Sequence, residues 1–311
     1  MPTWPKRFLM MMNDAYHQPV LLKESVDGLD IKRDGVYVDA TFGGGGHSRE
    51  ILGRLGDQGR LFAFDQDEDA LQNALDDVRF RLIDQNIRYI KHYLKFYGIL
   101  KVDGILADFG VSSHQFDRAD RGFSTRFDAE LDMRMDRKRE LSAHEVVNAY
   151  PERDLAKVLF QYGELRNANA MAKALVAARD REPIRTTDQL KRALGPFLPK
   201  MRENKVLAQV YQAIRIEVNQ ELEVLREFLG QVPELLVPGG RLSLISYHSL
   251  EDRLVKRFIR SGTFQDEPEK DFYGNINVPL RKVGGLIVPG PEEISRNSRA
   301  RSAKLRIAER I

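Results

Sequence analysis

The sequence predicts an α/β fold in which a ligand binds beyond the carboxyl ends of parallel strands. Three observations support this prediction. An alternating apolar run at residues 36–38 breaks into the four glycines 43–46 and then enters a helical pattern. The apolar runs 61–65 and 102–108 each end in an aspartate, which places negative charge at the same edge of the predicted sheet.

The glycine run has the properties of a ligand loop. Glycine adopts positive φ and lets the backbone come close to a bound molecule, and the helix that follows begins with free N–H groups. A tight strand-to-helix turn is the simpler alternative, but a single glycine would be enough for it. We therefore expect the glycines to line a binding site at the end of the first strand.

Asp65 provides the second part of a nucleoside site. It follows the glycines by about twenty residues, the spacing at which an acidic residue reaches a ribose hydroxyl. The run departs from the dinucleotide fingerprint G-x-G-x-x-G, because His47 stands where a third glycine would allow close helix packing. A nucleoside without a pyrophosphate is therefore favoured, and S-adenosylmethionine fits better than NAD.

The composition excludes several kinds of chemistry. The 311 residues contain no cysteine, which excludes disulfides, thiolate zinc sites, iron–sulfur clusters and thiol nucleophiles. Methylation of a pyrimidine ring carbon through a cysteine adduct is excluded with them, so a methyl group should pass directly to a heteroatom, and no metal is required. No apolar run approaches the length of a membrane span, and residues 1–14 lack the features of a signal peptide. We expect a cytoplasmic protein with no membrane partner.

Positive charge is concentrated near the C-terminus. Residues 253–311 contain thirteen lysines and arginines against seven acidic residues, whereas the net charge of the whole chain is only +3. This basic end is the expected face for phosphate, although a single cluster such as 296–301 is equally well explained as a solvated surface. A last alternating strand is expected at 305–308 within the same segment.

The elements after the second strand continue the α/β alternation. We expect a helix at 70–78, a third strand at 87–93 that ends in Tyr93, and a fourth strand at 102–108. Tyr93 could stack on an adenine, and a position in the core is an equally good explanation for an aromatic residue there.

Titratable residues gather at the predicted strand tips. Asp39, Asp65 and Asp108 would lie on neighbouring tips, where a partly buried carboxylate needs a donor or a ligand. A later strand at 241–247 ends at His248, which adds an imidazole to the same edge.

A helical insert is expected between the fourth strand and this later strand. Residues 115–140 are irregular and could fold over a site, and 142–198 have helical patterns with capping boxes that start at Ser142 and Thr186. An amphipathic helix at 207–229 then returns the chain to the sheet. The insert is the expected substrate-recognition part.

Eight segments occur in one order along nearly the whole chain and together resemble one family. They are 17–22, 39–48, 108–113, 121–124, 131–136, 212–219, 246–253 and 299–302. In this combination the sequence resembles the bacterial S-adenosylmethionine-dependent ribosomal small-subunit RNA methyltransferases known as RsmH or MraW. That family methylates the exocyclic N4 amine of a cytidine in the decoding centre of 16S ribosomal RNA.

The resemblance implies a Rossmann-like class I methyltransferase fold with a seven-stranded sheet. The sheet domain would comprise 1–120 and 205–311, and an all-helical domain at 121–204 would be inserted in it. Matching motifs imply that S-adenosyl-L-methionine is bound by Gly45, Gly46, His47, Asp65, Tyr93, Asp108 and Gln115. Three positions depart from the family, which usually has proline at 114, phenylalanine at 93 and proline at 298. The implied partner is 16S ribosomal RNA or the small subunit, and the oligomeric state stays open, with a homodimer as one alternative.

The implied reaction needs an acceptor for the amine. The lone pair of cytosine's exocyclic amine is delocalised into the ring, so an enzyme must orient the amine in line with the methyl group and accept a hydrogen bond from it. We expect Asp108, with Ser112 and Ser113, to provide the acceptor, and His248 to take the proton or to fix the base, without a covalent intermediate. Phe109 or Tyr247 could stack on the base.

Three other functions share some of these features. A DNA amine methyltransferase should carry an Asn/Asp/Ser-Pro-Pro-aromatic motif where this chain has Asp108-Phe-Gly-Val111. A nicotinamide dehydrogenase would need a glycine in place of His47. A non-catalytic RNA-binding assembly factor could use the same fold, and an assay of methyl transfer to small subunits would discriminate it.

Overall fold

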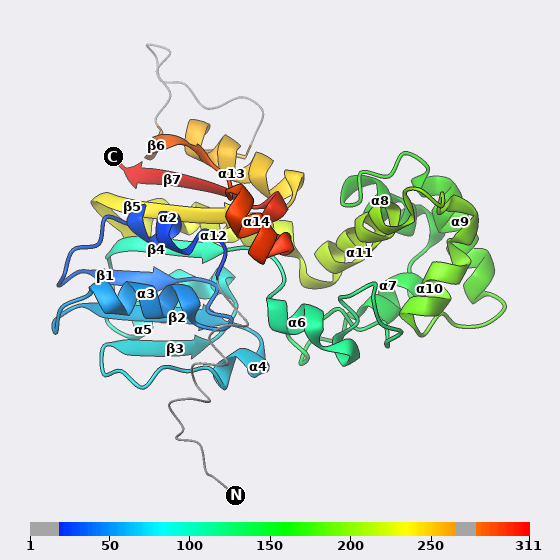
Figure 1. Ribbon diagram of the computed structural model, residues 1–311, viewed down its shortest axis with the longest axis horizontal. Helices are drawn as coiled ribbons and strands as arrows, with labels where there is room; N and C mark the ends of the chain where they lie inside the picture. The colour runs from blue at the N-terminus through cyan, green and yellow to red at the C-terminus, as the bar shows by residue number, and fades with distance from the viewer. Residues whose placement is uncertain (1–18, 265–277) are drawn as a thin grey trace, which may run out of the picture. The chain divides into compact units, whose positions relative to one another are not determined.

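The computed structural model describes residues 19–264 and 278–311 (Figure 1). The chain folds into two compact units. The sheet unit comprises the parts up to Gly110 and from Val224 onward, and the helical unit comprises Val111–Glu223. These boundaries differ from the expected ones at 120/121 and 204/205, because 111–120 and the helix at 203–219 belong to the helical unit. His17, in the first of the eight segments, lies outside the described residues.

Within the described ranges, seven strands form one sheet in the order β3-β2-β1-β4-β5-β7-β6. β7 runs antiparallel to both of its neighbours, β5 and β6, and the other paired strands are parallel. This is the strand arrangement of class I S-adenosylmethionine-dependent methyltransferases, so the predicted fold class is confirmed. The strands are β1 (Val36–Asp39), β2 (Arg60–Asp65), β3 (Phe80–Asp84), β4 (Val102–Asp108), β5 (Leu236–Ser246), β6 (Leu280–Ile287) and β7 (Lys304–Arg310).

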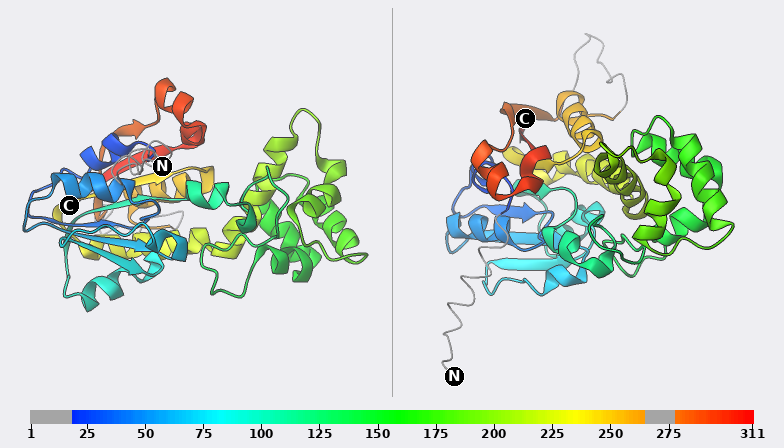
Figure 2. Two further views of the ribbon diagram at one scale, coloured as in Figure 1. Left: turned by 60° about the horizontal axis from the view of Figure 1, so that its bottom comes forward. Right: turned by 45° about the vertical axis from the view of Figure 1, so that its right-hand side comes forward.

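Helices cover both faces of the sheet (Figure 2). Successive strand residues point to opposite faces, so Tyr37 packs with α2 (Leu22–Asp27) and α3 (Gly46–Arg54). Its neighbour Val38 packs on the other face with α5 (Ile90–Phe96), α12 (Glu221–Leu235) and α13 (Ser249–Ser261). Burial on two faces explains why the central strands are apolar along their length. The carboxyl ends of β1, β2, β4 and β5 share one edge, as the predicted site requires.

The predicted third strand is wrong. Phe80–Asp84 forms β3, and the stretch expected as a strand is instead the 3-10 turn η1 (Ile87–Tyr89) followed by α5. Asn86 starts this turn, since its side chain accepts a 3.0 Å hydrogen bond from Arg88 N–H. The buried Ile90 and Leu94 are four residues apart, which is a helical period. The helix expected at 70–78 is also shorter, and only α4 (Glu68–Leu71) forms.

The helical unit packs its helices around a core of its own. The capping boxes at Ser142 and Thr186 are confirmed, and they begin α7 (Ala143–Ala149) and α10 (Thr187–Ala193). The amphipathic run predicted as one helix is two, because Gln220 adopts a left-handed φ of 53° between α11 (Glu203–Asn219) and α12. The described helices of this unit are α6 (Ser113–Asp117), α7 (Ala143–Ala149), α8 (Glu152–Gln161), α9 (Ala168–Arg179), α10 (Thr187–Ala193) and α11 (Glu203–Asn219).

The irregular segment before α7 is fixed by buried polar groups. Asn219 accepts a 2.8 Å hydrogen bond from Met135 N–H and donates one to Met133 O, also at 2.8 Å. The guanidinium of the fully buried Arg121 donates to Arg134 O and Met135 O at 3.0 and 3.3 Å. Segments 121–124, 131–136 and 212–219, three of the eight that resemble the family, thus contact one another inside the helical unit.

The last elements complete the sheet unit. Helix α14 (Pro291–Arg296) and the 3-10 turn η4 (Ser298–Ser302) lie between β6 and β7. No helix in the described part of the chain is long and apolar enough to cross a membrane.

Candidate active site

The glycine loop connects β1 to α3. Gly43 and Gly45 have φ values of 51° and 75°, and Gly45 N–H closes a turn on Phe42 O at 2.7 Å. Gly45 is the N-cap of α3 and offers no side-chain cap, so the first N–H groups of the helix stay available to a ligand.

Each glycine of the loop meets different surroundings. A Cβ atom on Gly45 would lie 2.8 Å from the Phe42 ring, and one on Gly46 would lie 2.1 Å from the Pro19 ring. A Cβ on Gly44 would meet no atom of the described residues within 4 Å. The loop is therefore closely packed at Gly45 and Gly46 and open at Gly44. A ligand-binding loop is expected to have such an open side.

The side chain of His47 points into the protein. It is 5% exposed, and its Nε2 lies 3.2 Å from Val20 O. Burial lowers the pKa of His47 although Asp39 opposes this shift. The ring therefore anchors the chain before α2, and only the backbone of His47 can contact a ligand at the loop.

Asp39 is also an internal group. It is 0% exposed, and it accepts hydrogen bonds from Ser48 Oγ at 2.6 Å and from Thr41 N–H at 3.1 Å. Burial raises its pKa. Ser48 in α3 and Thr41 in the loop are thus the hydrogen-bond donors that we expected a buried Asp39 to need. The carboxylate fixes the loop and does not face a ligand.

Asp65 holds the other side of the loop. Its carboxylate accepts hydrogen bonds from Gly43 N–H at 2.8 Å and from Asp67 N–H at 2.9 Å. Burial raises its pKa to about 6. The two backbone donors fix the carboxylate beside the glycines, and a carboxylate oxygen that accepts one hydrogen bond can accept another from a ribose hydroxyl.

Asp108 differs from the other two carboxylates. Its backbone N–H donates a 2.6 Å hydrogen bond to Thr41 Oγ1, which joins the tips of β4 and β1. The Tyr247 hydroxyl interacts with the carboxylate, but Oδ1 is buried and has no hydrogen-bond partner within the described ranges. Burial raises the pKa of Asp108 to about 8, and the charges of Asp39 and Glu251 add to this shift. Asp108 thus carries an unsatisfied buried oxygen.

His248 caps helix α13. Its Nδ1 accepts from Glu251 N–H at 3.4 Å, and its Nε2 lies 3.1 Å from Glu251 Oε1 without hydrogen-bond geometry. Glu251 Oε2 accepts from the N–H groups of Tyr247 and His248 at 2.9 and 3.3 Å. The imidazole, 8% exposed, is therefore held against Glu251 at the tip of β5.

Comparison with known proteins identifies the family. Residues 14–311 match the model of the MraW methylase family. A Christiangramia forsetii protein, "Ribosomal RNA small subunit methyltransferase H", is 65% identical over 97% of this chain and 100% of its own length. Proteins of the same name from Flavobacterium johnsoniae and Bacteroides thetaiotaomicron are 67% and 54% identical over 95% of this chain and 98% of their own lengths. The chain belongs to the MraW methylase family.

As a member of the MraW methylase family with a class I sheet, the protein uses S-adenosyl-L-methionine as methyl donor. The residues at the strand tips fit this cofactor. The open side of Gly44, the uncapped start of α3 and the Asp65 carboxylate suit a nucleoside. The buried carboxylate of Asp108 at the tip of β4 suits a positively charged neighbour such as the sulfonium group.

Three further predicted site residues belong to elements other than the strand tips of the sheet unit. Tyr93 is half-buried in α5 against the core and makes an edge contact with His92, with ring centroids 5.1 Å apart. Gln115 belongs to the helical unit, where its Oε1 accepts from Ser112 N–H at 3.0 Å in a capping box. Ser113 begins α6, and its side chain lies outside the described part of the structure. The sheet unit therefore unites Gly45, Gly46, His47, Asp65, Asp108 and His248 at one edge.

Sequence reasoning did not single out Thr41, Ser48, Glu251 or the Tyr247 hydroxyl, which also lie at this edge of the sheet. Thr41 and Ser48 lie in the 39–48 segment and Glu251 lies in 246–253, so the segments themselves were the available signal. Nothing in the pattern showed which side chains these groups contact.

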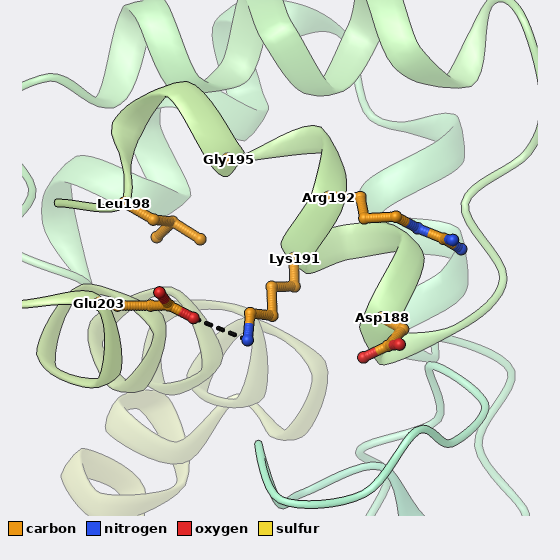
Figure 3. A pocket seen from close by; sticks show the side chains of 6 residues that line it. All are labelled: Asp188, Lys191, Arg192, Gly195, Leu198 and Glu203. Atoms are coloured by element: carbon orange, nitrogen blue, oxygen red, sulfur yellow. Dashed lines mark ion pairs between the residues drawn. The ribbon is translucent and has the colours of Figure 1, made fainter. Parts of the chain in front are cut away.

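Two surface hollows lie wholly in the helical unit and contain none of the predicted site residues. Figure 3 shows the first, with a volume of about 440 Å³, where Lys191 forms a 2.7 Å ion pair with Glu203. The second, about 380 Å³, lies beside the hydrogen bond from Tyr150 Oη to Glu217 Oε1. Charged and polar residues make up most of the lining of both hollows, unlike the largely apolar clefts that enclose small ligands.

Proposed function

We propose that this methylase transfers a methyl group from S-adenosyl-L-methionine to the exocyclic N4 amine of a cytidine in the decoding centre of 16S ribosomal RNA. The transfer is direct and in line, without a covalent enzyme intermediate. The RNA class is supported by relatives more than 60% identical whose names describe a ribosomal RNA small subunit methyltransferase. The lack of cysteine supports a heteroatom acceptor, since no thiol can activate a ring carbon.

The buried, unpartnered Asp108 Oδ1 is the observation that carries the proposal. S-adenosyl-L-methionine supplies an electrophilic methyl group when it is bound. The Asp108 carboxylate, in the ionised form that a neighbouring sulfonium cation favours, accepts a hydrogen bond from the amine, which aligns the nitrogen and raises its electron density. Ser113 is proposed as a second acceptor for the amine.

His248 is proposed to fix the base or to take the proton released by the amine. Its ring lies against Glu251, which fixes the orientation of the imidazole at the tip of β5. Gly45, Gly46 and the backbone of His47 hold the nucleoside with Asp65 on the ribose, and Tyr93 and Gln115 are proposed further contacts. We propose that the helical unit recognises the RNA. We also propose that the enzyme acts in the cytoplasm, where the small subunit is found.

The test is incubation of the protein with isotopically labelled S-adenosyl-L-methionine and small subunits from cells that lack this enzyme. Digestion of the RNA to nucleosides should yield labelled N4-methylcytidine, and Asp108→Ala should abolish it. Label in another nucleoside would overturn the N4 assignment. No label in any nucleoside, from folded protein that binds the cofactor, would favour a non-catalytic assembly factor.

A further inference from the structure

Helix α13 presents only basic side chains to solvent. The helix begins at its cap His248, directly beyond the tip of β5, and packs over β5, β6 and β7 (Figure 1). Its exposed residues are Arg253, Lys256 and Arg260, which are three and four positions apart and therefore lie on one side of the helix. The other residues of α13 are buried or half-buried. We call these three exposed residues the basic stripe.

The acidic residues of α13 do not neutralise the basic stripe. Glu251 and Asp252 are only 2% and 9% exposed. Glu251 accepts hydrogen bonds from two backbone N–H groups just before the helix, at 2.9 and 3.3 Å. Asp252 accepts hydrogen bonds from Arg306 Nε at 2.7 Å and from Lys304 Nζ at 3.2 Å, both on β7. Both carboxylates are thus bound by groups of the sheet, on the side away from solvent.

The basic stripe differs from an ordinary solvated helix face, which contains charges of both signs. Other helices pair a cation with an acid three or four positions away, as in Glu50–Arg54 of α3, Asp154–Lys157 of α8 and Glu292–Arg296 of α14. Lys256 and Arg260 form no ion pair with any residue that the structure describes. The helix dipole favours a cation only in the last turn, where Arg260 lies, so it does not explain Arg253 or Lys256.

The phosphate backbone of a single RNA strand fits the basic stripe. Phosphates attract lysine and arginine without regard to base sequence. At a rise of about 1.5 Å per residue, the stripe is about 10 Å long and begins about 8 Å along the helix from His248. A strand whose unstacked base enters the site at the tips of β4 and β5 can therefore continue along α13.

We propose that the basic stripe binds the phosphate backbone of the ribosomal RNA strand beside the nucleotide that is methylated. This inference rests on the proposed function and deepens it, because it assigns RNA binding to the sheet unit as well as to the helical unit. Phosphate contacts fix the position of a strand but do not read its sequence. The stripe therefore holds the strand, and the base is selected at the strand tips.

The test is the double variant Lys256→Gln/Arg260→Gln. Glutamine is a good helix former, and both positions are exposed, so the fold should be kept. Fluorescence anisotropy with a labelled single-stranded RNA of about 20 nucleotides measures affinity between about 50 and 200 mM salt. We expect about tenfold weaker binding at the lower salt concentration. The slope of log affinity against log salt should become shallower by about 1.4, because each phosphate contact with a single strand contributes about 0.7.

Steady-state methylation of small subunits gives a second readout. The double variant should raise KM, and kcat should change less than about twofold, because the stripe binds the strand equally before and during methyl transfer. The swap Lys256→Arg/Arg260→Lys keeps both charges, so its RNA affinity and salt slope should match those of wild-type protein.

Arg33→Gln/Arg60→Gln is the matched control. It removes two exposed arginines of the same unit, one at the start of β2 and the other shortly before β1. These positions lie at the amino ends of the strands, opposite the candidate site. RNA affinity and KM should stay within about twofold of wild type. An equal loss in both double variants would show a general effect of net charge and would overturn the inference.

Two further results would contradict the role of the basic stripe. Unchanged RNA affinity and salt slope in folded Lys256→Gln/Arg260→Gln would do so directly. Normal RNA binding with a raised KM for small subunits would assign the stripe to an acidic protein surface instead. Failure of wild-type protein to methylate small subunits would remove the proposed function, and the RNA titrations would still decide whether the stripe binds RNA.

Discussion

Ser48 Oγ donates a 2.6 Å hydrogen bond to Asp39 Oδ2, which joins the first turn of α3 to the end of β1 across the glycine loop. We expect Ser48→Ala to lower the free energy of unfolding by about 1–3 kcal/mol, because a fully buried carboxylate loses its closest donor. Urea denaturation measures this change. The exposed Ser295 in α14 is the control, and Ser295→Ala should change stability by less than about 0.5 kcal/mol. Equal stability of the two variants would contradict the role of Ser48.

Two glycines of α3 give a matched pair for the loop. Gly46→Ala should weaken binding of S-adenosylhomocysteine at least about tenfold, because its Cβ would lie 2.1 Å from Pro19 and must shift the loop. Gly53→Ala has no described atom within 4 Å of its Cβ and should raise stability by up to about 1 kcal/mol. Calorimetry and thermal unfolding measure both variants. Normal binding by Gly46→Ala would show that the loop does not cradle the nucleoside.

Asp65 should make cofactor binding depend on pH. Its pKa is raised to about 6, so the ionised form that accepts ribose hydroxyls is lost as the pH falls through 6. We expect the affinity for S-adenosylhomocysteine to fall between pH 7.5 and 5 in wild-type protein. Asp65→Asn should bind about 10- to 100-fold more weakly at pH 7.5 and show a flatter pH dependence. Calorimetric titrations across this range test the prediction, and an unchanged slope in the variant would refute it.

Asp108 should reduce the stability of the free protein at high pH. Its folded pKa of about 8 exceeds the usual carboxyl value of 3.8, so the folded state binds more protons than the unfolded state between these values. Stability is therefore lost as the pH rises through this window, up to about 8. Asp108→Asn removes the buried charge and should be about 1–3 kcal/mol more stable than wild type at pH 9, although inactive. Urea denaturation at pH 5 and pH 9 measures the difference, which should shrink at pH 5.

The position of the candidate site at the carboxyl ends of the strands was predictable, because it depends on local sequence patterns. The alternation in 36–38, the glycine run and the aspartates at 65 and 108 each identify a strand end without knowledge of the rest of the fold. The capping boxes at Ser142 and Thr186 were equally local. The confirmed fold class therefore follows from short-range signals, together with the resemblance.

The errors come from features that only packing determines. A short apolar run such as 87–93 fits a strand or a helix, and Asn86 and the core contacts of Ile90 and Leu94 select the helix. The direction of a side chain at the loop is also set by distant partners, such as Val20 for His47. No pattern could show that the Tyr247 ring packs on the backbone at Gly110. The roles of the site residues stay predictions that the binding and activity experiments above address.

The pairing of β4 with β5 has a consequence for the order of assembly during synthesis. These two strands are neighbours near the centre of the sheet, yet the whole helical unit separates them in the chain. When the ribosome has delivered β4, the partner that completes the catalytic edge does not yet exist. If the helical unit folds first, it brings the end of β4 closer to the start of β5. The chain between the two strands then behaves as a shorter loop, and closing it costs less entropy. The pairing of β4 with β5 can thus form only after the insert has been synthesised.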